Sequence, residues 1–150
     1  MKALIAAPVL LLSACAGGGA GAPAGTERPT IVSLNPCTDA ILAEVAAPGQ
    51  LLAISHYSKD PRASSMQPGD AARYDATGGT VEEVLALDPD VVLAGSFIAP
   101  ATRAALADLG IRVETVGSVG SVADSIAQVR QLAALTGDKA AGEALAARIE

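Results

Sequence analysis

Short apolar runs alternate with amphipathic stretches along the chain from residue 30 onward. Four of these runs are continuous and rich in valine, isoleucine and leucine, which is typical of buried strands. The predicted strands cover residues 30–34, 51–55, 91–95 and 111–116. Continuous apolar strands separated by helices are typical of a parallel sheet, so the pattern predicts an α/β fold with a parallel sheet and helices on both faces.

The segments between these strands carry the marks of helix ends. Asn35 and Pro36 form a cap followed by proline at the first helical position, and a Pro-Gly pair at 48–49 ends that helix. The segment 56–77 is polar and rich in turn residues, so we expect a long irregular loop there. Further helices are predicted over residues 81–87, 101–109 and 122–136, followed, after a break at 136–137, by a last helix that runs to the end of the chain.

Two adjacent glutamates open the short helix at 81–87. Thr80 and Glu83 stand three residues apart, as in a capping box, where each side chain bonds the backbone N–H of the other residue. We therefore assign Glu83 a structural role. Glu82 is not needed for this box, and we expect its side chain to project outward.

The N-terminal segment has the pattern of a targeting sequence. An apolar run at 3–12 follows Lys2 and is too short for a bilayer, which needs about 20 residues. It ends in Leu-Ser-Ala-Cys, which resembles a bacterial lipobox. We predict a lipoprotein signal peptide over 1–14, lipidation at Cys15, and a flexible Gly/Ala/Pro tether over 15–27. An ordinary secretory signal without lipidation is the alternative.

Composition restricts the possible functions. A chain of 150 residues that is 51% hydrophobic can bury one good core. The net charge of −6 argues against nucleic acid, which requires clustered lysine and arginine. One histidine and two cysteines predict neither a metal site nor a disulfide framework. Cys37 lies just inside a predicted helix, and we expect it to be a small buried apolar residue.

The sequence offers little equipment for catalysis. Ser96 follows a predicted strand, but no base stands near it in the sequence. The Gly-Ser-Val-Gly stretch at 117–120 lacks the pattern of a phosphate-binding loop. We therefore expect a binding protein and no enzyme. A secreted α/β lipoprotein enzyme or a structural lipoprotein is the alternative from another class.

Four segments, in this order and spacing, carry a resemblance to a known family: IVSLNPCTDAIL, LLAISHYSKDP, GGTVEEVLALDPDVVLAG and VETVGSVGSVADSIAQVRQLAALTG. They resemble the substrate-binding proteins that serve ABC importers of ferric siderophores, haem and cobalamin. The resemblance covers about residues 30–137. It implies a class III periplasmic binding protein, with two Rossmann-like α/β lobes joined by a long helix and with the ligand in the cleft between them.

The resemblance also implies a division of this chain. Residues 28–120 correspond to the N-terminal ligand-binding lobe, and residues 121–150 correspond to the start of the connecting helix. The second lobe is missing, so we interpret the chain as a fragment, with a natural single lobe as the alternative. Because each lobe supplies only one wall of the cleft, we expect weak ligand binding. We also expect a monomer.

Candidate ligand-binding residues follow from the strand ends, because ligands of parallel sheets bind beyond the carboxyl ends of the strands. Some candidates come directly after a predicted strand, and two come from the long loop. Surface aromatics without a ligand are the alternative for the two tyrosines, and an incidental polar loop residue is the alternative for His56. The candidates are Asn35, His56, Tyr57, Ser96 and Phe97 at the strand ends, with Tyr74 and Thr77 from the loop.

The resemblance narrows the ligand and names partners. Tyr57 falls where cobalamin-binding relatives place a tyrosine. Two further aromatic residues that those relatives use correspond to positions near Ala76 and Gly95, so this chain lacks them. A ferric siderophore is therefore the favoured ligand, with cobalamin or haem as alternatives, and we expect no other cofactor. Glu82 matches the glutamate by which family members dock on permease arginines. The expected partners are the ABC permease, its ATPase and the membrane that holds the lipid anchor, on the periplasmic or cell-surface side.

Overall fold

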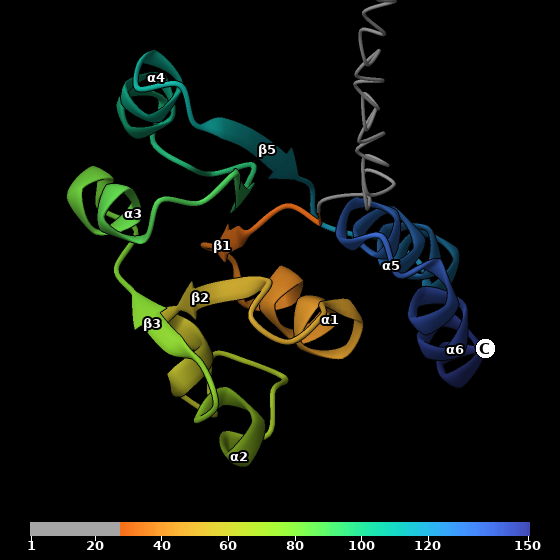
Figure 1. Cartoon of the computed structure of the whole chain (residues 1–150). Helices are drawn as coiled ribbons and strands as arrows, with labels where there is room; N and C mark the ends of the chain where they lie inside the picture. Colours follow the sequence, from red (N-terminus) through yellow and green to blue (C-terminus); the bar gives the residue numbers. More distant parts are fainter. Residues whose placement is uncertain (1–27) are drawn as a thin grey trace, which may run out of the picture.

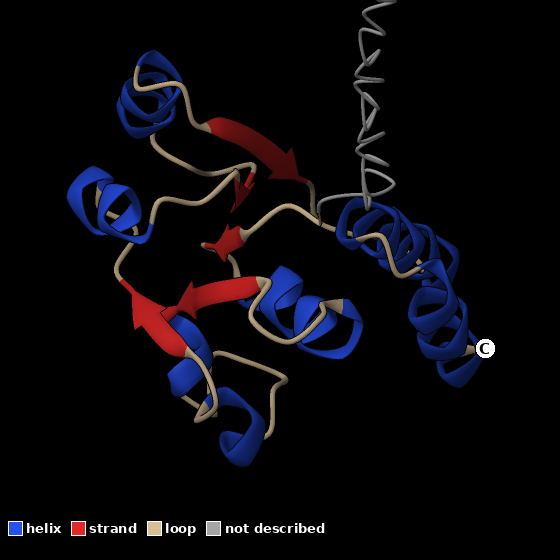
Figure 2. Cartoon of the chain, viewed as in Figure 1, coloured by secondary structure: helices blue, strands red, loops and turns tan. Residues whose placement is uncertain are grey.

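The computed structural model describes residues 28–150, and five parallel strands form a single sheet in the order β3-β2-β1-β4-β5. The predicted signal peptide, the tether and Cys15 lie outside the described residues. Figure 2 shows the strands at the centre and helices around them. The strands are β1 (Ile31–Ser33), β2 (Leu51–Ser55), β3 (Asp75–Thr77), β4 (Val91–Gly95) and β5 (Arg112–Val116).

Helices cover both faces of the sheet, as Figure 1 shows, with α3 and α4 on one side and α1 and α5 on the other. This arrangement confirms the predicted fold class. The helices are α1 (Pro36–Val45), α2 (Pro68–Ala71), α3 (Val81–Leu87), α4 (Pro100–Asp108), α5 (Val122–Thr136) and α6 (Lys139–Ile149), with a 3-10 turn, η1, at His56–Lys59.

The hydrophobic core has two layers because the central strands are buried on both sides. On β1, Ile31 packs toward α1 and α5, whereas its neighbour Val32 packs toward α3 and α4. Alternating side chains thus enter opposite layers, which explains the continuous apolar runs in the sequence. Leu42 of α1 and Leu106 of α4 fill the two layers, and both are fully buried.

The prediction of an irregular loop over 56–77 was wrong. This segment contains η1, the single-turn helix α2 and the edge strand β3. β3 pairs with β2 alone, and of its three residues only Thr77 is buried. Because this edge strand buries one residue, it has no apolar run from which the sequence could predict it.

The helical segment after residue 121 folds back on the lobe. Gly137 ends α5 with φ of 78°, in the left-handed region that favours glycine. α6 then packs beside α5, and both contact α1 (Figure 1). A Cβ placed on Gly142 would lie 2.3 Å from the Cβ of Ala133, so the close approach of α5 and α6 requires glycine at this position.

Candidate functional site

The carboxyl edge of the sheet opens into a cavity of about 750 Å³. Four of the candidate residues line it, namely Asn35, Tyr57, Ser96 and Phe97. The loop 117–119, which follows β5, completes the lining together with Gln128 of α5. None of the described residues that line the cavity is charged. This volume and character are those of a small-molecule site, where apolar walls carry a few polar groups.

Asn35 is fixed in the cavity wall by its role as the cap of α1. Its Oδ1 accepts the backbone N–H of Cys37 at 3.0 Å. The Thr38 hydroxyl donates to the Asn35 carbonyl at 2.9 Å, which ties the turn from β1 into α1. Cys37 is exposed and lines the cavity, so our expectation of a buried residue was wrong. Its position just inside the helix start, on the outer face, keeps its side chain away from the core.

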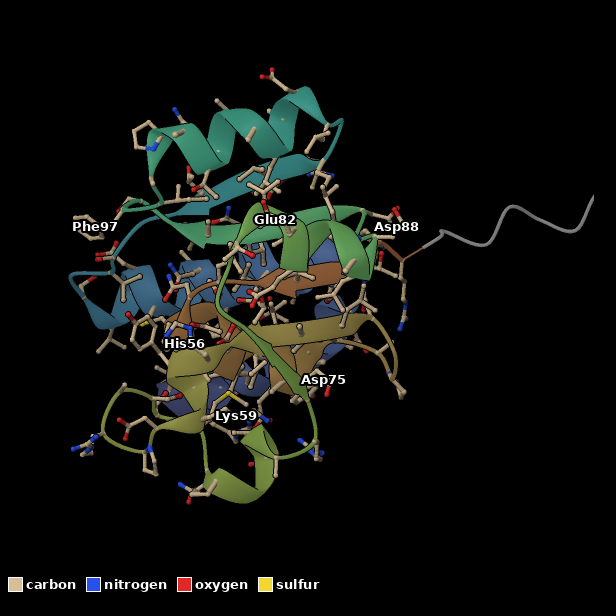
Figure 3. The ribbon with its side chains drawn as sticks, turned by 90° about the vertical axis from the view of Figure 1, so that its left-hand side faces the viewer. His56, Lys59, Asp75, Glu82, Asp88 and Phe97 are labelled. Carbon is tan, nitrogen blue, oxygen red and sulfur yellow. The ribbon has the colours of Figure 1, made fainter. Side chains whose placement is uncertain are left out.

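Ser96 and Phe97 lie in the short connection from β4 to α4. The Phe97 side chain is 92% exposed, and Figure 3 shows it projecting from the edge where the strands end. A backbone hydrogen bond from the Ile98 N–H to the Gly95 carbonyl, at 3.1 Å, closes this turn. Phe97 therefore offers an aromatic surface to whatever enters the cavity.

Tyr57 belongs to η1, directly after β2. The Ser55 hydroxyl accepts the Tyr57 N–H at 3.3 Å and caps the turn. The ring of His56 lies against that of Tyr57, with ring centroids 4.0 Å apart and an interplanar angle of 37°. The His56 Nδ1 is 3.4 Å from the Thr77 carbonyl oxygen. His56 is exposed and does not line the cavity.

The structure does not bring Tyr74 to this edge. Tyr74 precedes β3 and therefore lies at the amino end of that strand, where Figure 3 labels its neighbour Asp75. It is half-buried against the core beneath α1, with the Arg73 guanidinium 5.7 Å from its ring centroid. Thr77 is at the carboxyl end of β3, but its side chain is buried and its hydroxyl donates to Glu83 Oε2 at 2.9 Å.

The family model described as periplasmic binding protein matches residues 31–150. This match covers most of the chain. The chain belongs to the periplasmic binding protein family. The name of this family describes its members as binding proteins of the periplasm. This agrees with the expectation of a binding protein and no enzyme. No curated protein matches the chain.

Solved structures show the same fold at low sequence identity. The periplasmic vitamin B12 binding protein BtuF of Vibrio cholerae is 22% identical, with a TM-score of 0.63 over 81% of this chain and 47% of that one. A possible iron-binding periplasmic protein of Staphylococcus epidermidis is 18% identical, with a TM-score of 0.65 over 81% and 48%. A periplasmic heme binding protein of Pseudomonas aeruginosa is 20% identical, with a TM-score of 0.60 over 77% and 41%. This chain spans less than half of each.

Asp39 is a buried acid of this binding protein that sequence reasoning missed. It is fully buried in α1, and its Oδ2 accepts the Ser55 N–H at 2.9 Å and the Ser58 hydroxyl at 2.6 Å. Burial raises the pKa of Asp39 to about 6, against the opposing effect of the hydrogen bonds from Ser58 and Ser55 and of the neighbouring Ser33 hydroxyl. One clue was present: Asp39 precedes Leu42 by three residues, and this spacing places both on one helix face.

Lys59 ties the turn of Tyr57 to the rest of the segment that follows it. Its Nζ donates to the carbonyls of Ala71, at 2.6 Å, and Tyr74, at 2.5 Å. Figure 3 shows Lys59 on the side of the molecule below His56. These two bonds join η1 to the end of α2 and the start of β3.

The two neighbouring glutamates of α3 have different surroundings. The predicted capping box is present: the Thr80 hydroxyl accepts the Glu83 N–H at 3.3 Å, and Glu83 Oε2 accepts the Thr80 N–H at 3.4 Å. The Thr77 hydroxyl, together with backbone N–H groups, lowers the pKa of Glu83. Glu82 is exposed and makes no hydrogen bond or ion pair with any residue between 28 and 150 (Figure 3).

Within residues 28–150, no group of three or more His, Cys, Asp or Glu side chains is placed to hold a metal ion. None of the helices in this range has the length and apolar character needed to cross a bilayer.

Proposed function

We propose that this protein is the substrate-binding component of an ABC importer for a metal chelate. A ferric siderophore is the favoured ligand, and cobalamin or haem is the alternative within the same family. The neighbours described as vitamin B12, iron and heme binding proteins support this range of ligands, and the family supports the transport role. The lobe would supply one wall of the binding cleft.

The observation that carries the proposal is the uncharged cavity at the carboxyl edge of the sheet. Its volume of about 750 Å³ suits a chelate with a large organic body. Tyr57 and Phe97 offer aromatic faces, and Asn35, Ser96 and Gln128 offer polar groups. Because no charged side chain lines this wall, we expect it to recognise the organic part of the chelate by stacking and hydrogen bonds.

Calorimetric titration with a panel of ferric siderophores, cobalamin and haem tests the proposal. We expect saturable binding of one class, and we expect Phe97→Ala to weaken it about tenfold, the loss of about 1.4 kcal/mol of contact. Leu109→Ala is the matched control, because Leu109 is also an exposed apolar residue, 54% accessible, at the end of α4. Because one wall of the cleft binds weakly, the titration extends to high chelate concentration. The proposal fails if no member of the panel binds there, or if both variants lose affinity equally.

We also propose that Glu82 docks on an arginine of the permease. The supporting observation is the contrast with Glu83: the Glu83 carboxylate is engaged in the capping box, whereas Glu82 is exposed and makes no hydrogen bond or ion pair within residues 28–150. An exposed carboxylate in the first turn of a helix is available to a basic partner.

Uptake of labelled chelate by cells tests this docking role. We expect Glu82→Ala to reduce uptake while leaving the melting temperature and the chelate affinity unchanged. Asp108→Ala is the control, since Asp108 is an exposed acid on a different helix. Normal uptake with Glu82→Ala contradicts the docking role and leaves the binding proposal standing.

We further propose that Cys15 carries a lipid anchor that holds the protein at the membrane near its permease, as a monomer. The lipobox-like sequence that ends in Cys15 supports this. Cell fractionation checks it: the protein should sediment with membranes, and Cys15→Ser should release it. Membrane retention of Cys15→Ser would contradict lipid anchoring at this residue.

A further inference from the structure

Asp39 joins α1 to both ends of the turn that carries Tyr57. Its Oδ2 accepts the N–H of Ser55, the last residue of β2, and the hydroxyl of Ser58 within η1. The Ser55 hydroxyl in turn accepts the Tyr57 N–H. His56 and Tyr57 therefore stand between two residues that the same buried carboxylate holds.

The network continues beyond the turn. The Ser58 hydroxyl accepts a hydrogen bond from the Ser64 hydroxyl at 3.5 Å, and the Ser64 hydroxyl accepts the Met66 N–H at 3.1 Å. Asp39 is the only buried ionisable side chain in the part of the chain that the structure describes. Its Oδ1 has no hydrogen-bond partner among residues 28–150. A proton on Oδ1 would leave both hydrogen bonds to Oδ2 in place.

We propose that Asp39 is a positioning residue for the binding site: by holding Ser55 and Ser58, it keeps the turn His56–Lys59 docked on the sheet and Tyr57 in the wall of the cavity. The consequence for the ligand rests on the proposed function. The docking of the turn itself is a property of this chain and is measurable without any ligand.

The ionisation of Asp39 sets the sign of a pH effect. When the turn opens, Asp39 meets water and regains its ordinary pKa of 3.8, whereas burial in the docked state raises the pKa to about 6. The docked state therefore binds a proton more tightly, so lowering the pH through 6 favours docking. Between pH 7.5 and pH 5 this difference corresponds to about a tenfold change in the equilibrium between docked and open turn.

Other ionisable groups surround the turn and must be separated from Asp39. Histidine side chains as a class change charge between pH 5 and 8, so His56 has to be removed from the experiment. The causes of the Asp39 shift are burial and hydrogen bonds from uncharged groups. The remaining ionisable side chains on α1 and on the elements packed against it are Cys37, Glu44, Tyr57, Lys59, Asp124, Arg130, Lys139, Glu143 and Arg148.

Amide hydrogen exchange, followed by NMR on the His56→Gln protein, measures the docking equilibrium. We expect the protection factors of the Ser55 and Tyr57 amides to rise about tenfold from pH 7.5 to pH 5, after correction for intrinsic exchange rates. Adding Asp39→Asn, which keeps an acceptor oxygen but cannot ionise, should reduce this change to less than about twofold.

Three comparisons define the origin of the effect. Asp60→Asn removes a half-exposed acid from the same segment and should keep the tenfold change. The amides of α4, on the opposite face of the sheet, should change less than about twofold, because local opening of α4 leaves Asp39 buried. Ser58→Ala removes one of the two donors and should lower Tyr57 protection at both pH values while the pH dependence remains.

Three results would overturn the proposal. The first is a protection factor that does not change with pH in the His56→Gln protein. The second is a tenfold change that persists when Asp39→Asn is added. The third is a Ser55 amide that exchanges only as slowly as the innermost β4 amides. The last result means that the turn opens only when the whole lobe unfolds. If no chelate binds to any variant, the proposed function fails, and the exchange profile still decides the role of Asp39.

Discussion

Tyr57 and Phe97 both stand at the carboxyl edge of the sheet, on segments that are held very differently. The turn of Tyr57 is hydrogen-bonded to Asp39 of α1. Ser55, the last residue of β2, caps the turn, and Lys59 bonds it to the end of α2. The connection that carries Phe97 has the backbone hydrogen bond from Ile98 to Gly95. One aromatic of the cavity is thus braced from three directions, and the other is presented on a short turn.

Because of this difference, the loss of conformational entropy on ligand binding is smaller at Tyr57 than at Phe97. A braced side chain is already ordered, so a ligand that contacts Tyr57 loses little conformational freedom there. Phe97 is 92% exposed and must be ordered when a ligand contacts it. The braced side can set the position of a ligand, whereas the other side can adapt to ligands of different shape.

Among changes to the segments that carry the two aromatics, the largest effect is expected from removing the brace at Lys59. Lys59→Met deletes two charge-assisted hydrogen bonds to the Ala71 and Tyr74 carbonyls and should lower the free energy of unfolding by about 2 kcal/mol. Urea unfolding measures this value. Arg62→Met is the matched control, because Arg62 lies in the same segment and its salt bridge within residues 28–150 is with half-exposed Asp60. Equal stability of the two variants would show that the segment is not held through Lys59.

A smaller effect is expected from the ionisation of Asp39. Its pKa is raised from 3.8 in the unfolded chain to about 6 in the fold, so the folded state binds the proton more tightly. Stability from this group therefore increases as the pH falls below 6 and is complete below 3.8. Between pH 7.5 and pH 5 the gain is about 1.4 kcal/mol, which corresponds to the tenfold change in the docking equilibrium. Urea unfolding of His56→Gln at both pH values measures it, and Asp39→Asn in the same background should remove it.

The braced side is also the side that the sequence described least well. The strands of the central sheet, the helix that Asn35 caps and the box formed by Thr80 and Glu83 were predicted, because caps and continuous apolar runs are local patterns. β3 was missed, since an edge strand with exposed Asp75 and Ala76 has no such pattern. The carboxyl-edge rule placed Asn35 and Phe97 at the cavity.

The brace itself depends on contacts between residues distant in the sequence. Asp39 and Ser55 are 16 positions apart, and Lys59 meets carbonyls 12 and 15 positions later. Helical periodicity could indicate that Asp39 is buried, but it could not name its partners. An irregular loop over 56–77 would allow Tyr74 to reach the carboxyl edge, but β3 places Tyr74 at the opposite end of that strand.

The contrast between engaged and free side chains recurs on α3, where a smaller effect is expected. Thr80→Ala removes the cap and should cost about 1 kcal/mol in the free energy of unfolding. Glu83→Ala should also lower the melting temperature, since it removes the acceptor of both the Thr80 N–H and the Thr77 hydroxyl. Glu82→Ala is the control and should leave the melting temperature unchanged. An equal decrease with both glutamate variants would contradict the division of roles.

The smallest effect on stability is expected at Phe97, which is the sharpest test of the comparison. Phe97→Ala should change the free energy of unfolding by less than about 0.5 kcal/mol, because a side chain that is 92% exposed loses almost no packing. Leu106→Ala, on the helix that follows, should cost about 2 to 5 kcal/mol, since Leu106 is fully buried. A loss above about 1 kcal/mol with Phe97→Ala would show that its ring packs on the lobe in solution. Both sides of the cavity would then be ordered before a ligand arrives, and the adaptable side would not exist.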